Sequence, residues 1–165
     1  MAEIVLTRVD FRLIHGQVVA AWNKYVNATK IVIIDDVLAQ DELMQTIYTS
    51  AAPPGVKVKI YDYAKAKRLW EKNQFGENGK VMVIFRNLQN CLKAFELGIN
   101  LGKVQIGGAP SSSGKKIIDK QVYMGEEDIA TMKRLKEEFN AEVYLHVVPA
   151  FSSMTYEEIL KKYEG

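Results

Sequence analysis

Short apolar runs alternate with amphipathic segments along the whole chain, and this alternation restricts the possible fold more than any other feature of the sequence. The runs at 30–35 (KIVIID) and 80–85 (KVMVIF) are rich in β-branched residues and have the length of buried strands. Between them, segments such as 41–51 and 63–73 repeat apolar residues at helical spacing. Parallel strands need crossover helices of this kind, so the pattern predicts an α/β fold.

The predicted elements follow one another without a linker, a repeat or a low-complexity tract. We therefore expect a single domain over residues 1–165. Its mostly parallel central sheet would have about seven strands, helices on both faces and antiparallel strands at one edge. The segment 56–62 alternates as an edge strand does. Further strands are expected at 3–9, 103–108, 116–124 (one or two short strands) and 141–148, and further helices at 16–26, 87–99, 126–140 and 155–165.

Composition argues against several classes of protein. The net charge of +2 is too small to indicate nucleic-acid binding, and no basic block stands out. Cys91 is the only cysteine, which rules out an internal disulfide and argues against structural zinc. The chain starts without a signal-peptide pattern, and no apolar run approaches the roughly 20 residues of a membrane span. We expect a cytoplasmic protein that is peripheral to membranes through partner subunits.

The stretch RVDFRLIHGQVVAAW (8–22) places an unusual set of charges where a strand meets a helix. Ligands bind at the carboxyl ends of parallel strands, and the free N–H groups of a helix start favour an anion. The same field favours neutral imidazole, which can act as a nucleophile. Arg8 and Arg12 would stabilise a phosphoryl group on His15, while Asp10 would orient an arginine or the imidazole.

A second interpretation of this stretch remains open. His15 would cap the helix, and the two arginines would pair with Asp10 and with the acidic turn at 35–36. The residue types alone do not separate a phosphohistidine site from this local structural role.

Two other segments carry weaker candidates. Asp35 and Asp36 end a buried strand and would suit magnesium. The favoured interpretation is structural: Asp36 or Asp41 caps the next helix, and Asp35 pairs with an arginine. In GGAPSSSGKK (107–116), the backbone of Gly107 and Gly108 would form an anion nest with nearby hydroxyls and lysines, or the segment is a plain surface loop. His146 and Cys91 lie in apolar patterns that favour a structural, buried role for each.

The stretch at 8–18 resembles the IIB components of the mannose/fructose/sorbose family of the bacterial sugar phosphotransferase system. The usual pattern there is Arg-Ile-Asp-Asp-Arg-Leu-Ile-His-Gly-Gln-Val, and this chain differs only by Val9 and Phe11. The segments IVIIDDVLAQDELMQTIYTSAAPPGVKV, GINLGKVQIGGAPSSSGKK and VYLHVVP are also similar to family segments, so the resemblance spans nearly the whole chain.

The resemblance implies a phosphocarrier that needs no cofactor, metal or nucleotide. His15 would accept a phosphoryl group on Nδ1 from the IIA component and pass it to a sugar held by the membrane-embedded IIC and IID components. Arg8 and Arg12 would stabilise that group, and Asp10 would hold the loop in shape. The predicted site residues are His15, Arg12, Arg8 and Asp10 for the chemistry, and Gly16, Gln17, Phe11, Gly107, Gly108 and Ser111 for phosphate or partner binding.

The sequence departs from the family pattern at Phe11 and in the loop at 107–116. Phe11 replaces an acid and would alter the contact with IIA, while Ser111 to Ser113 would compensate for a changed loop as hydroxyl donors.

Two competing functions remain open. The chain would be a regulatory or binding module that holds an anion reversibly, or an aspartyl-phosphate domain that uses Asp35 or Asp36. The identity of the sugar stays undetermined, and the sheet edges expected at the third or seventh strand leave a homodimer open.

Overall fold

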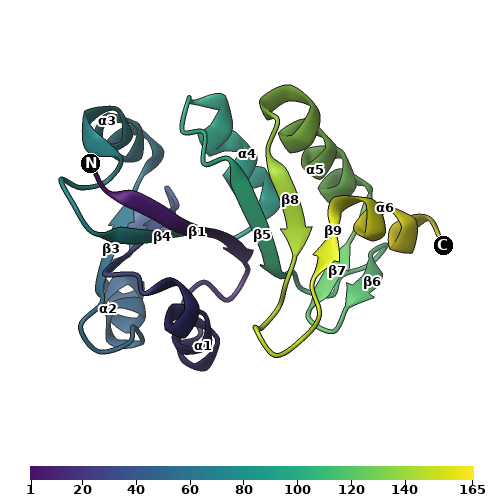
Figure 1. The fold of residues 1–165 in the computed structure, drawn as a ribbon, viewed down its shortest axis with the longest axis horizontal. Coiled ribbons are helices and arrows are strands. Elements are labelled where there is room, and N and C mark those ends of the chain that lie inside the picture. Colours follow the sequence, from purple (N-terminus) through teal and green to yellow (C-terminus); the bar gives the residue numbers. More distant parts are fainter.

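The computed structural model describes residues 1–165, and its main feature is a seven-stranded sheet (Figure 1). All neighbouring strands pair in parallel except the last two, which are antiparallel at one edge. The predicted α/β class, with a mostly parallel sheet and an antiparallel edge, is therefore confirmed. The spatial order is β3 (Lys57–Tyr61), β2 (Lys30–Ile34), β4 (Lys80–Phe85), β1 (Glu3–Asp10), β5 (Lys103–Gly108), β8 (Glu142–Leu145) and β9 (Met154–Thr155).

Helices cover both faces of this sheet, as the alternating pattern predicts. Figure 1 shows α1 (Gly16–Val26) and α2 (Glu42–Ser50) below the sheet, and α3 (Tyr63–Asn73), α4 (Leu88–Glu96) and α5 (Glu126–Phe139) above it. The last helix, α6 (Tyr156–Glu164), packs against β8. The segment predicted as one or two short strands forms a separate hairpin of β6 (Lys116–Asp119) and β7 (Val122–Met124).

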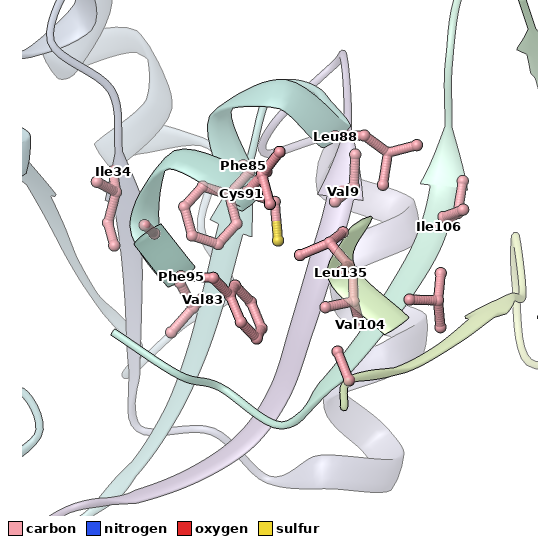
Figure 2. Close-up of a cluster of buried hydrophobic side chains, with 14 of the residues drawn as sticks. Val9, Ile34, Val83, Phe85, Leu88, Cys91, Phe95, Val104, Ile106 and Leu135 are labelled. Carbon is pink, nitrogen blue, oxygen red and sulfur yellow. The ribbon is translucent and has the colours of Figure 1, made fainter. Parts of the chain in front are cut away.

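Two hydrophobic cores lie on opposite faces of the sheet. The larger has 30 buried residues and fills the space under α3, α4, α5 and α6, whereas the smaller has 12 and lies under α1. In β4, the residues from Val81 to Phe85 are all buried, because both faces of a central parallel strand are covered. Figure 2 shows Cys91 within the larger core beside Phe85 and Leu88, as expected for a small buried thiol.

Polar residues fix several helix starts where the sequence predicts them. The Asp41 carboxylate accepts the N–H of Met44 at the start of α2, and the Asn87 side chain accepts the N–H of Asn90 at the start of α4. The predicted helix 87–99 is too long at its end. Gly98, at φ +93°, adopts a left-handed conformation that stops α4 early.

The end of the sheet differs from the expectation for residues 141–148. β8 stops at Leu145, and the chain turns back so that β9 pairs with it. The alternating strand β3 is an edge, as predicted, but β8 is covered by β9. The short turn η1 (Leu38–Gln40) and β9 were not predicted, because two- or three-residue elements carry no periodic pattern. None of the helices has both the length and the apolar character needed to cross a bilayer.

Candidate functional site

The loop that joins β1 to α1 lies at the carboxyl edge of the sheet and is held by two buried side chains. Its first part is a turn in which the N–H of Leu13 donates to the carbonyl of Asp10 at 2.9 Å. Leu13 has φ +57°, a strained conformation for a branched side chain, yet it is only 1% exposed. Ile14 is buried beside it in the smaller core. Burial of these two residues leaves Arg12 and His15 on the outer side of the loop.

His15 occupies the N-cap position of α1 without acting as a cap. Its side chain makes no capping hydrogen bond, and the residue is exposed. Gly16 and Gln17, also exposed, form the first turn, whose N–H groups have no intrahelical partners. Of the two interpretations that the sequence leaves open, the capping one is wrong for the His15 side chain. The imidazole is free for chemistry beside unpaired N–H donors.

Asp10 organises the charges of this loop. Its buried carboxylate accepts hydrogen bonds from the backbone N–H, Nε and Nη2 of Arg12 at 3.0, 3.0 and 2.9 Å, and from Nη2 of Arg8 at 3.1 Å. Burial alone would raise the pKa of Asp10, but the hydrogen bonds and charges of Arg12 and Arg8 outweigh it and lower the pKa. Asp10 is thus ionised at neutral pH and orients both arginines, as predicted.

Arg12 is fixed on one edge and open on the other. Its Nε and Nη2 atoms bind Asp10 side by side, while Nη1 donates to no group of the protein. The side chain is 21% exposed, and the ring of Phe11 lies 5.6 Å from its Cζ. A guanidinium held in this way presents a ready donor edge to an oxyanion.

Arg8 is buried beneath the loop, whereas the predicted contact with a phosphoryl group would need an open position. Its side chain is 1% exposed, and Nη1 donates to Oε1 of Gln105 at 2.6 Å and to the carbonyl of His146 at 3.0 Å. Nη2 donates to Asp10 and, at 2.8 Å, to the carbonyl of Val147. In this arrangement protein groups engage both Nη atoms of Arg8. It supports the loop from beneath through Asp10.

Gln105 is a buried polar residue beneath the loop that the sequence pattern did not predict as part of the site. It lies in β5 opposite Arg8, and its amide nitrogen also donates to the hydroxyl of Tyr144 at 3.2 Å. The one available signal was a glutamine inside an otherwise apolar strand, which indicates a buried polar partner nearby.

The two glycines of the predicted anion nest belong to β5, and they serve another purpose. A Cβ at Gly107 would overlap the guanidinium of Arg8, and a Cβ at Gly108 would lie 2.6 Å from Oδ1 of Asp10. Both positions therefore need glycine because the side chains of β1 lie against them, and the anion nest at these glycines stays a prediction. Gly108 and Phe11 also border a cavity of about 310 Å³ between β5 and the start of α4. Ser111 is exposed in the loop beyond, and its contact with phosphate stays a prediction.

The remaining candidates make structural contacts. Asp35 pairs with Arg86 at 3.2 Å and accepts the N–H of Leu38, while Asp36 accepts the N–H of Tyr63. His146 contacts the carbonyl of Phe151 through Nε2 at 2.8 Å and packs edge-on against Trp22. Burial raises the pKa of the Cys91 thiol, which disfavours a thiolate nucleophile. No group of three or more potential metal ligands gathers anywhere in the structure.

Comparisons with known proteins agree on one family. The sequence model for the sorbose subfamily IIB component of the phosphotransferase system (PTS) matches residues 4–165. The sorbose-specific EIIB component of Lacticaseibacillus casei is 38% identical over 134 residues, which is 81% of each chain. The solved structure of manxB from Thermoanaerobacter tengcongensis superposes with a TM-score of 0.93 at 38% identity, covering 100% of this chain and 99% of that one. The IIBSor domain of the Klebsiella pneumoniae sorbose permease gives a TM-score of 0.86 at 32% identity, covering 96% and 97%.

Proposed function

The chain belongs to the sorbose subfamily of IIB components of the phosphotransferase system, and from this premise we propose that it carries a phosphoryl group on His15. The donor is a phosphohistidine of the IIA component, and the acceptor is a sugar held by the membrane components IIC and IID. The protein acts as one IIB domain over residues 1–165, in the cytoplasm and peripheral to the membrane through these partners. The printed names of its relatives cover sorbose, mannose, fructose and N-acetylgalactosamine, and the sugar of this chain stays undetermined.

The first transfer exchanges one phosphorus–nitrogen bond for another. The unprotonated ring nitrogen of His15, which we assign as Nδ1, attacks the phosphorus of the donor. As the new bond forms, His15 loses the proton from its other ring nitrogen. The donor imidazole leaves with the electron pair of its bond to phosphorus and takes up a proton, so it ends as neutral imidazole. Because the broken and formed bonds are alike, the step needs little driving force, and positioning and charge stabilisation dominate its rate.

The second transfer moves the group from His15 to a hydroxyl of the sugar. The bond from phosphorus to the His15 nitrogen breaks as a phosphorus–oxygen bond forms. The hydroxyl loses its proton, and the imidazole regains one. In both transfers the phosphoryl oxygens carry negative charge that the loop must stabilise.

The observation that carries this proposal is the pairing of an uncommitted imidazole with an oriented guanidinium on one short loop. The exposed His15 ring lies at the start of α1, where the N–H groups of Gly16 and Gln17 face an incoming anion. Arg12, anchored by Asp10, keeps Nη1 free as a donor to phosphoryl oxygens. Arg8 acts indirectly, by holding Asp10 in place.

Phosphorylation by a reconstituted donor chain tests the proposal. The chain is incubated with the general PTS proteins, a IIA component and labelled phosphoenolpyruvate, and its intact mass is then measured. We expect a gain of one phosphoryl group in an acid-labile, base-stable linkage. The His15→Ala variant should gain none, whereas the matched control His146→Ala should still be labelled. Label in His15→Ala that maps to His146 would show that the site is misassigned.

A reversible anion-binding module is the second candidate, because free helix N–H groups and Arg12 also suit a noncovalent anion. It predicts binding of inorganic phosphate without any mass gain in the same experiment. The aspartyl-phosphate alternative predicts a base-labile adduct that depends on magnesium. It has less support, since hydrogen bonds and ion pairs already engage Asp35 and Asp36.

A further inference from the structure

Phe11 is a loop residue that the proposed chemistry does not use, and its position suggests a reason for its presence. It follows Asp10 in the turn, and its N–H donates to the carbonyl of Gly108 at 3.2 Å, which fixes its backbone against β5. Its side chain is partly buried and borders the cavity beside β5. From there the ring reaches the guanidinium of Arg12, with 5.6 Å between the ring centroid and Cζ.

The contact matters because Arg12 is held mainly by one side chain. Its Nε and Nη2 atoms bind Asp10, but the side chain is 21% exposed, so water competes for the same donors. A long arginine side chain also loses rotamer entropy when it is held in one orientation. An aromatic ring over a guanidinium attracts the cation and keeps water from that side.

We propose that Phe11 is a positioning residue for Arg12. Its ring favours the orientation in which Arg12 binds Asp10 and keeps Nη1 available to the phosphoryl group. Phe11 touches neither the phosphoryl group nor His15, and it acts through Arg12 alone. The catalytic part of this inference rests on the proposed function, whereas the orientation of Arg12 is measurable without any phosphoryl transfer.

The orientation is tested by the exchange of the Arg12 Nε–H with water, followed by NMR in the unphosphorylated protein. We expect Phe11→Leu, which keeps apolar bulk but removes the ring, to speed this exchange roughly two- to fivefold, the size of a partly exposed cation–π contact. Phe11→Tyr should restore slow exchange. Tyr25→Leu removes an exposed aromatic ring on α1, away from Arg12, and should leave the exchange rate unchanged. Unchanged exchange in Phe11→Leu would overturn the proposal whether or not His15 is phosphorylated.

The consequence for transfer is tested by a double-mutant cycle on the rate of phosphorylation by IIA. Phe11→Leu should lower the maximal rate by the same two- to fivefold and leave the donor concentration for half-maximal rate unchanged. In an Arg12→Ala background the same substitution should have no further effect. A rate loss of equal size in both backgrounds would show that Phe11 acts on something other than Arg12. A rise in the half-maximal donor concentration alone would assign Phe11 to partner contact and also overturn the proposal.

Discussion

At the scale of single residues, two arginines four positions apart perform opposite tasks. Arg8 is 1% exposed and donates to Gln105, Asp10 and three backbone carbonyls, whereas Arg12 keeps one edge open to solvent. The sequence indicates that both serve an anion site, because guanidinium groups in one loop look alike. It cannot tell which one lies beneath the loop, since that depends on β5 and on the turn after β8.

Arg8 should prove to be a stability residue. Arg8→Met leaves Asp10 with one guanidinium instead of two and orphans the carbonyl of His146. The carbonyl of Val147 loses one of its two donors and keeps Nε1 of Trp22. Removing one partner of a buried ion pair costs about 3 kcal/mol or more. We therefore expect the free energy of unfolding in urea to fall by at least that amount. A variant as stable as the native chain would contradict the supporting role.

Arg12 should prove to be a transfer residue. In Arg12→Ala the buried Asp10 retains Arg8, so the circular dichroism spectrum and cooperative unfolding should persist. The rate of phosphorylation by IIA should drop about 100-fold or more, which is the cost of losing one oriented donor to a developing oxyanion. Equal transfer kinetics in the native chain and the variant would leave Arg12 with a structural role only.

At the scale of elements, the parts that periodicity can encode were predicted well. The sequence-predicted bounds of α1, α3, β4 and β5 coincide with those of the structure. The failures are elements made by tertiary contact. β9 exists because the chain after His146 turns back onto β8. The early end of α4 is instead a local effect of Gly98, a left-handed glycine that the sequence places at the end of this helix. Of the site, the loop and its charges were predictable, but Gln105 and the packing of β5 against Arg8 were not.

The element that shapes the site without touching its chemistry is β5. Gly107→Ala puts a methyl group where the guanidinium of Arg8 lies, so Arg8 or β5 must move. Overpacking of this kind costs about 1–3 kcal/mol. We expect a lower unfolding midpoint and shifted amide resonances for Asp10 and Arg12. Resonances of the loop that stay in place in Gly107→Ala would argue against this packing.

At the scale of the whole molecule, the buried carboxylate of Asp10 links global stability to pH. Its pKa is lowered in the folded protein below the ordinary value of 3.8, so the folded state binds this proton less readily than the unfolded state. The ionised Asp10 stabilises the folded state fully above about pH 4. This stabilisation is lost as the pH falls towards the pKa of Asp10 in the folded protein. Asp10→Asn, which cannot titrate, should be less stable at neutral pH.

The measurement is the free energy of unfolding of both proteins between pH 7 and pH 2. The difference in unfolding free energy between the native chain and Asp10→Asn should be largest above pH 4. It should become smaller below pH 4, as Asp10 of the native chain takes up its proton. A gap that keeps its size down to pH 2 would show that the charge of Asp10 is not what the two arginines stabilise.

The attachment of Arg8 to the carbonyls of His146 and Val147 also has a consequence for the timing of biosynthesis. These acceptors lie 138 and 139 residues after Arg8. A ribosome synthesises the chain from the N-terminus, so the loop between β1 and α1 emerges early, long before the carbonyls that hold Arg8 beneath it. The loop therefore reaches its final conformation among the last events of synthesis, because an incomplete chain lacks the two carbonyls that hold Arg8 against Asp10.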